Sequence, residues 1–139
     1  LHKLSTPEIL VVEDDVIPPA NAIRMLRKGL SEDTAFVSAA YQARSGGCCV
    51  WDDHFAGNYR DQGKGVQEIA GCGFGCLLLR REALNGHEFK AGDSFDRFFG
   101  EWLERKGWKR KVDWNCVAEH LIHQQSEPFF PEPICLPES

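Results

Sequence analysis

Apolar and polar positions divide the first third of the chain into a strand, a helix and a second strand. The apolar run Ile9–Val12 predicts a buried strand over residues 8–12. Apolar residues at helical spacing predict a helix over residues 20–29, with Pro19 in its first turn. A mostly buried strand is expected over residues 35–41. This order is typical of a βαβ unit, so we expect the sheet to be at least partly parallel.

The second half of the chain continues with short elements and one clear helix. Residues 66–70 predict a strand, residues 71–76 a glycine-rich turn, residues 77–79 a further strand and residues 80–86 a short helix. Phenylalanine and tryptophan recur at three- and four-residue intervals over residues 93–106, which predicts a helix with one apolar stripe. Asp93 or Ser94 would cap this helix and Gly107 would end it. Residues 108–114 predict an edge strand, and residues 116–123 a last apolar segment.

These elements define the expected fold class: an α/β domain with a mixed, mainly parallel sheet flanked by helices. The 139 residues suffice for one domain, residues 1–139. Residues 124–139 hold four prolines without periodicity and are expected to form an extended tail.

Charge and composition narrow the classes of function. The net charge of −5, without a block of like charges, argues against nucleic-acid binding. No apolar run is long enough to span a membrane and no signal peptide is recognisable, so we expect a cytoplasmic protein, with peripheral membrane association as an alternative. Six cysteines are then expected as reduced thiols. Disulfides, or a zinc site, remain alternatives; the zinc ligands would be Cys72, Cys76, Cys116 and Cys135.

Three consecutive acidic residues, Glu13-Asp14-Asp15, follow the first strand directly. Carboxylates at the end of a buried strand repel one another and are partly desolvated, and a divalent cation would compensate for both effects. Ligand sites in open α/β sheets also lie beyond the carboxyl ends of strands. We therefore expect a metal or phosphate site here; the alternative is an ordinary polar turn.

The segment from residue 42 to residue 65 is irregular and long enough to carry function. Its aromatic and imidazole rings form either a platform for a ring-shaped ligand or anchors that hold the loop to the core; they are Trp51, His54, Phe55 and Tyr59. Asp52-Asp53-His54 is a rival metal site. Alternate glycines at Gly71, Gly73 and Gly75 indicate either a sharp turn or the close approach of a ligand.

The order of motifs resembles a known family. The strand ending in Glu13-Asp14-Asp15-Val16-x-Pro is followed by Phe36–Tyr41-x-x-Arg44, Gly71-x-Gly73-x-Gly75-x-Leu77–Glu82, the helix from Asp96-x-x-Phe99 to Gly107, and a strand ending near His120. This order is similar to the second half of nucleotide-sugar glycosyltransferases with the GT-A fold, family-2-like. The resemblance covers about residues 9–122.

The resemblance implies a metal site at the acidic cluster. Glu13-Asp14-Asp15 matches the Asp-x-Asp motif of the family, with Glu13 in place of the usual first aspartate. Asp15 would hold Mn²⁺ or Mg²⁺, which bridges the donor diphosphate, and His120 matches the late histidine that completes the metal shell. The alternative for His120 is a structural role, and His123 is a weaker candidate.

The resemblance also implies a base and a pocket. Asp96 matches the acidic residue that serves as catalytic base in inverting members; Phe95 replaces a preceding glutamate, so Asp93 is a rival. An interaction of Asp96 with the helix dipole is the alternative. The pocket for donor and acceptor would be formed by Asp14, Gly71, Gly73, Gly75, Trp51 and Arg44.

The function expected from this resemblance is metal-dependent transfer of a sugar from a nucleotide-sugar donor to a hydroxyl of a glycan, lipid or small-molecule acceptor. In this family the nucleotide is bound by a half that precedes the acidic motif. The chain is thus expected to be a fragment, or to obtain that half elsewhere, or to be a degenerate domain. A non-catalytic binding or assembly module and a metal-dependent phosphoester hydrolase are the alternatives.

Overall fold

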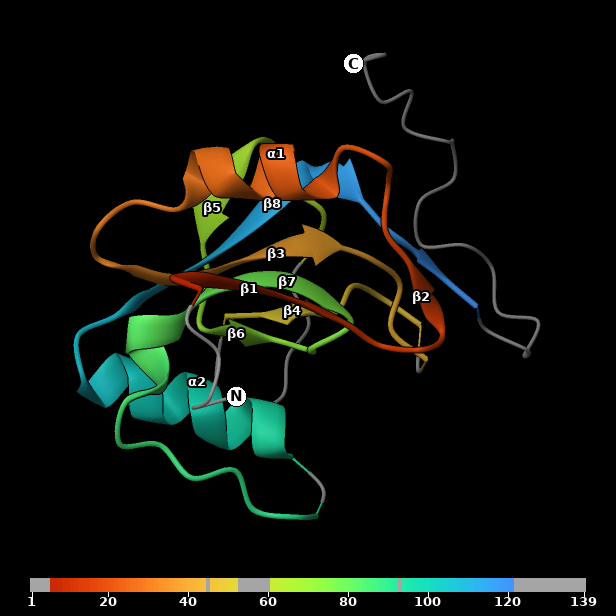
Figure 1. Ribbon diagram of the computed structural model, residues 1–139. Coiled ribbons are helices and arrows are strands. Elements are labelled where there is room, and N and C mark those ends of the chain that lie inside the picture. Colours follow the sequence, from red (N-terminus) through yellow and green to blue (C-terminus); the bar gives the residue numbers. More distant parts are fainter. Residues whose placement is uncertain (1–5, 45, 53–60, 93, 122–139) are drawn as a thin grey trace.

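A five-stranded sheet forms the centre of the protein. The computed structural model describes residues 6–44, 46–52, 61–92 and 94–121. The strand order in the central sheet is β1-β7-β3-β8-β5 (Figure 1). Its strands are β1 (Glu8–Val12), β3 (Thr34–Ala40), β5 (Val66–Glu68), β7 (Cys76–Arg80) and β8 (Lys109–Val117). Two small sheets pair β2 (Val16–Ile17) with β9 (Glu119–His120), and β4 (Val50–Trp51) with β6 (Gly71–Cys72).

The sheet is mixed, as expected, but the prediction that it is mainly parallel is wrong. Only β3 and β8 pair in parallel within the described sheet, whereas β1–β7, β3–β7 and β5–β8 are antiparallel. The strands β1 and β3 run in the same direction, as a βαβ unit requires, but β7 lies between them. The order of elements along the chain does not reveal such an inserted strand, because β7 comes from much later in the sequence.

Strand β8 is central in the sheet, which corrects the prediction of an edge strand. It lies between β3 and β5 and is longer than expected. Its basic residues suggested an edge, yet they find partners: the Arg110 guanidinium donates to the carbonyl oxygens of Ala70 and Trp108, and Lys111 Nζ donates to that of Gly29. The long side chains thus carry their charges to backbone acceptors while their stems pack along the sheet.

The two α-helices cover opposite faces of the central sheet. Helix α1 (Ala22–Gly29) lies on one face, whereas α2 (Phe95–Arg105) and the short 3₁₀ helix η1 (Arg81–Leu84) lie on the other (Figure 1). Leu26 of α1 is fully buried, and so are Phe99 and Leu103 of α2. Each helix therefore presents one apolar stripe to the sheet.

The ends of α2 lie where the sequence predicted them, with Ser94 at the first cap position and Gly107 after the last turn. Gly107 has φ +82°, and its N–H donates to the carbonyl of Glu104, so it ends the helix as expected. At the start, Ser94 occupies the cap position with φ 71° but makes no side-chain capping bond. Asp93 lies outside the described residues. Asp96 instead accepts a hydrogen bond from the backbone N–H of Arg97 at 2.8 Å.

The apolar stripe of α2 is broader than its buried face. Phe99 is fully buried, but Phe95 and Phe98 are 38% and 57% exposed. The sequence pattern treated all three as core positions, which is wrong for Phe95 and Phe98. None of the helices in the described part of the chain is long and apolar enough to cross a membrane.

Candidate functional site

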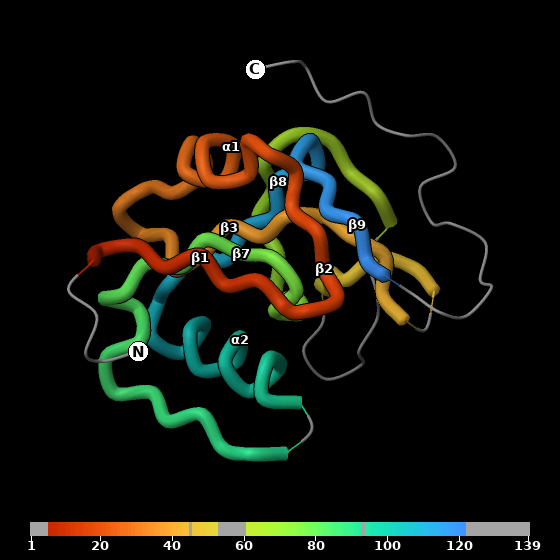
Figure 2. The backbone as a smooth tube through the Cα atoms, turned by 45° about the vertical axis from the view of Figure 1, so that its right-hand side comes forward, coloured from red at the N-terminus to blue at the C-terminus, as the bar shows by residue number. Residues whose placement is uncertain are grey.

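The backbone at the end of β1 is fixed from two sides. The N–H of Glu13 donates to the carbonyl of Gly75 at 3.0 Å, and the N–H of Val16 donates to the carbonyl of Glu13 at 3.2 Å. The chain then enters β2, which pairs with β9 so that Val16 lies opposite His120 (Figure 2). The N–H of Leu121 donates to the carbonyl of Asp15 at 2.8 Å. These bonds place the acidic cluster beside β9.

Asp15 and His120 form a direct contact at this junction. Oδ2 of Asp15 lies 3.1 Å from Nε2 of His120, and Nδ1 of His120 lies 2.6 Å from the carbonyl oxygen of Gln42. A carbonyl oxygen only accepts, so Nδ1 carries a proton and donates it. Nε2 therefore faces the carboxylate, where either a second proton or a cation satisfies both groups.

Arg44 completes this charged cluster. Its guanidinium makes an ion pair with Asp15 from a largely exposed position. Burial alone would raise the pKa of Asp15, but the hydrogen bonds and charges of His120 and Arg44 together hold that pKa below its usual value. Asp15 is therefore ionised at neutral pH and able to serve as a ligand or an ion-pair partner.

A pocket of about 210 Å³ opens beside the cluster and gathers side chains from six segments of the chain. Its lining residues are Glu13, Tyr41, Ala43, Arg44, Cys49, Trp51, Gly73, Phe74, Phe95, Asp96 and His120. Burial raises the pKa of Asp96, and partial burial together with the Asp15 carboxylate raises that of Glu13. Two carboxyl groups with raised pKa values thus face one pocket, an arrangement typical of sites that transfer protons.

The glycine run lies against aromatic side chains. An added Cβ would lie 2.4 Å from Tyr41 Cζ at Gly75, 2.5 Å from the Tyr41 hydroxyl at Gly73, and 2.6 Å from Trp51 Nε1 at Gly71. The N–H of Gly75 also donates to the Tyr41 hydroxyl at 2.8 Å. The absence of a Cβ therefore admits two aromatic rings, while the chain bends at Phe74 and Gly75 between β6 and β7, and Gly73 lines the pocket.

Trp51 serves as an anchor and as a wall at once. It is only 8% exposed, and its indole lies against Gly71. Trp51 therefore holds its segment to the core, which is the second of the two alternatives given for these rings. It also lines the pocket. The other proposed platform rings, His54, Phe55 and Tyr59, lie outside the described residues, as does most of the rival Asp52-Asp53-His54 site.

The structure gathers most of the predicted site residues and separates a few. Glu13, Asp15, Arg44, Asp96 and His120 belong to one cluster or its pocket. Asp14 is exposed and does not line the pocket, and among the glycines only Gly73 is a lining residue. Asp93 and His123 lie outside the described part of the chain.

Sequence reasoning missed Tyr41 and Gln42. Tyr41 is buried, lines the pocket, and its ring meets that of His120 edge-on with centroids 5.6 Å apart. Gln42 orients His120 through its backbone carbonyl, which no side-chain pattern reveals. The sequence indicated Tyr41 only indirectly. Glycines leave space beside the backbone, and the Tyr41 ring fills that space at Gly73 and Gly75.

A divalent cation fits part of this arrangement. Within the described residues, no group of three or more His, Cys, Asp or Glu side chains is positioned to hold a metal by itself. Asp15 and His120 nonetheless direct ligand atoms at one another, and Mg²⁺-type sites in proteins commonly use one or two carboxylates together with substrate phosphates and water. The imidazole favours Mn²⁺ over Mg²⁺. The pair therefore fits a cation whose other ligands come with a bound phosphate.

The described cysteines are buried free thiols. They are Cys48, Cys49, Cys72, Cys76 and Cys116; Cys135 lies outside the described residues. Burial raises the pKa of Cys72 and Cys116 to about 12 and that of Cys76 to about 11. Buried free thiols of this kind are typical of core packing.

Comparison with known proteins identifies the fold alone. The crystal structure of A197 from STIV superposes with a TM-score of 0.67 and 18% sequence identity, over 84% of this chain and 58% of A197. The chain thus spans little more than half the length of that relative. No family model and no curated protein matches the sequence.

Proposed function

We propose that the protein is a metal-dependent glycosyltransferase domain that transfers a sugar from a nucleotide-sugar donor to an acceptor hydroxyl. The observation that carries the proposal is the contact between Asp15 and His120, with Asp96 lining the pocket beside it. A phosphate-bridging cation and a base facing the same cavity are the parts that this transfer needs. The resemblance of the motif order to GT-A enzymes selects this reaction over other phosphate chemistry.

The side chains have distinct roles in this proposal. Asp15 and His120 would hold Mn²⁺, which offsets the charge that develops on the leaving diphosphate. Arg44, whose guanidinium lies largely in solvent beside Asp15, would bind a diphosphate oxygen. Glu13 would adjust the charge at the rim of the site.

Asp96 would act as the base. Its raised pKa makes the carboxylate a stronger proton acceptor than an exposed aspartate. The pocket would place the acceptor hydroxyl within hydrogen-bond reach of this carboxylate. This assignment corresponds to an inverting reaction.

One observation favours a second candidate function, a binding or assembly module without metal. Arg44 already forms an ion pair with Asp15, so the carboxylate is neutralised without a cation. In such a module the Arg44 guanidinium would capture an anionic ligand and no sugar would be transferred.

Release of nucleoside diphosphate from a panel of uridine and guanosine diphosphate sugars tests the proposal, with Mn²⁺ or with chelator. We expect Mn²⁺-dependent hydrolysis that is lost in Asp15→Asn. Asp14→Asn is the matched control, because the Asp14 side chain is exposed and does not line the pocket. Equal turnover by Asp15→Asn and wild type would exclude the metal role, and calorimetric binding of diphosphate without Mn²⁺ or turnover would favour the binding module.

A further inference from the structure

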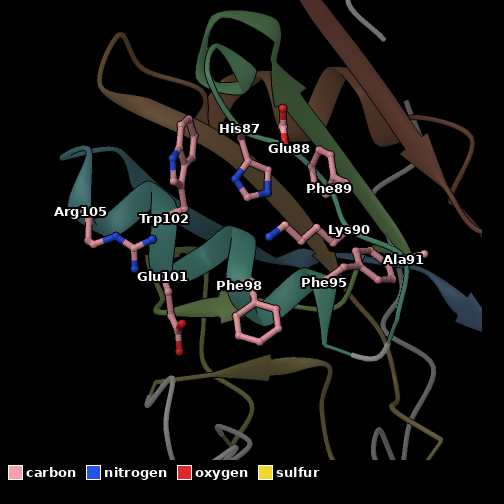
Figure 3. A pocket seen from close by; sticks show the side chains of 10 residues that line it. All are labelled: His87, Glu88, Phe89, Lys90, Ala91, Phe95, Phe98, Glu101, Trp102 and Arg105. Carbon is pink, nitrogen blue, oxygen red and sulfur yellow. The ribbon is translucent and has the colours of Figure 1, made fainter.

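A second, larger pocket lies between helix α2 and the segment from residue 87 to residue 91. Its volume is about 400 Å³, within the usual range of small-molecule sites. Figure 3 shows the lining side chains of the segment and of the helix, with His87, Phe89 and Lys90 lying beside the helix. The pocket is lined by His87, Glu88, Phe89, Lys90, Ala91, Phe95, Phe98, Glu101, Trp102 and Arg105.

Exposed phenylalanines distinguish this pocket from an ordinary surface hollow. Phe89, Phe95 and Phe98 are 39%, 38% and 57% exposed, although Phe99 on the same helix is fully buried. Phe89 and Phe95 pack edge-on against Phe74, with centroids 6.0 and 5.2 Å apart. Phe98 makes no ring contact with a described residue, so its face is available to a ligand. Exposed aromatic groups that gather at one place mark a binding surface.

Charged side chains of both signs surround these rings. Lys90 and Arg105 make no ion pair with any described residue, and the Lys90 side chain extends over the helix between His87 and Phe98 (Figure 3). Glu88 is exposed, and Glu101 accepts a hydrogen bond from Arg97 at 3.2 Å. Burial and the charge of Arg105 lower the pKa of His87, which is therefore neutral and both donates and accepts.

This combination selects the chemistry of the ligand. A lipid chain would leave the cations of Lys90 and Arg105 without partners on the pocket wall, and a phosphate would meet the carboxylates of Glu88 and Glu101. Hydroxyl groups both donate and accept, so a polyhydroxylated ligand satisfies cations and carboxylates alike. Its C–H faces would pack against the phenylalanine rings. An oligosaccharide combines these properties.

The two pockets share one lining residue, Phe95. This residue lines both of them, and the next residue along α2 is Asp96, the candidate base. Phe74, which lines the smaller pocket beside Asp15 and His120, packs against Phe95. A chain of sugar units lying in the larger pocket would thus direct its end toward the Asp96 carboxylate.

We propose that the larger pocket binds an oligosaccharide, and, resting on the proposed glycosyltransferase function, that this oligosaccharide is the acceptor. Sugar units pack on Phe89, Phe95 and Phe98, while Lys90, Arg105 and Glu88 bind their hydroxyl groups. The acceptor class is therefore a glycan and not a lipid.

Binding of the full chain to a printed array of linear and branched oligosaccharides tests the proposal. The array is probed with EDTA and without nucleotide sugar, so that neither metal nor donor is needed. We expect retention on a related set of glycans, at least tenfold weaker for Phe98→Ala. Phe98 is exposed, so its truncation leaves the fold intact, which circular dichroism would verify. Ile23→Ala, on α1 and 43% exposed, is the matched control and should bind as wild type does.

Each result has a defined meaning. An array without any bound glycan, or equal binding by Phe98→Ala and wild type, would overturn the pocket assignment. Binding of phenyl phosphate or of phosphatidylcholine vesicles in place of glycans would overturn the choice of ligand class. Glycan binding by a protein that lacks donor hydrolysis would overturn only the acceptor role, so failure of the proposed function is distinguished from failure of the pocket.

Discussion

Oδ2 of Asp15 lies 3.1 Å from Nε2 of His120, although the two residues are 105 positions apart in the chain. The contact depends on the pairing of β2 with β9 and on the Gln42 carbonyl that orients the imidazole. It is the structural relationship on which the proposed metal site depends.

Replacing His120 should weaken Mn²⁺ binding without unfolding the protein. His120→Asn removes the nitrogen that faces Asp15, and loss of a group that holds or orients a metal typically costs about 10- to 100-fold in affinity. Calorimetric titration with Mn²⁺ in the presence of a nucleoside diphosphate measures the change. Glu119→Gln, one position earlier in β9 and exposed, is the control. Unchanged affinity in His120→Asn would assign the histidine a structural role.

Arg44 should have opposite effects on metal and on diphosphate. Its ion pair with Asp15 competes with a cation, so Arg44→Gln should tighten binding of Mn²⁺ alone. The same change removes a phosphate-binding group and should weaken binding of the diphosphate at saturating Mn²⁺. Two titrations compare the variant with wild type. Weaker binding of Mn²⁺ alone would contradict the competition.

Asp96→Asn should abolish most of the transfer activity. Removal of a general base typically lowers the rate by about 10²- to 10⁴-fold. The measurement is transfer to an acceptor at saturating donor, together with hydrolysis of the donor by water. Loss of transfer comparable to that in Glu104→Gln, on the same helix but lining neither pocket, would argue against a specific role of the Asp96 carboxylate.

The same substitution should stabilise the protein at neutral pH. Burial raises the pKa of Asp96 in the folded state, so ionisation of this carboxyl group opposes folding. Below about pH 4, the ordinary aspartate value, the group is protonated in both states and the variant has little advantage. As pH rises through the folded-state pKa, wild type loses this contribution and Asp96→Asn does not. Urea unfolding across this range measures the difference, and an advantage that shrinks as pH rises would contradict the direction.

Gly75→Ala should destabilise the fold through Tyr41. The new Cβ would lie 2.4 Å from Tyr41 Cζ, and overpacking of a core typically costs about 1–3 kcal/mol. Urea unfolding measures the loss. Tyr41→Phe leaves the Gly75 N–H without its acceptor and should also destabilise. Because both changes act on one contact, the double variant should be non-additive; strict additivity would contradict the contact.

The sequence predicted most of the site because its chemistry is local. An acidic cluster after an apolar strand, an aspartate in the first turn of a helix and a late histidine are each visible as residue types. Their convergence on one pocket was expected from the resemblance to GT-A enzymes. Asp14 did not follow, because successive side chains at a strand end diverge: Glu13 lines the pocket and Asp15 contacts His120, whereas Asp14 is exposed.

Strand order and packing could not be predicted in the same way. Strand β7 inserts between β1 and β3, and strand direction depends on partners that local patterns do not encode. Residues such as Arg110 suggested an exposed edge, although backbone carbonyls satisfy them inside the sheet. Periodicity placed Phe98 on the apolar stripe of its helix but could not indicate that this side chain stays 57% exposed.

The β2–β9 ladder is only two residues long on each strand, yet it joins the two ends of the described chain. Pairing β2 with β9 closes a loop that contains most of the described chain, which costs much conformational entropy and forms few hydrogen bonds. This ladder should therefore form late in folding. It should also open before the central sheet does, with fast amide exchange at Val16 and Leu121 and slow exchange along β3. The site would then be assembled and dismantled on a domain that stays folded.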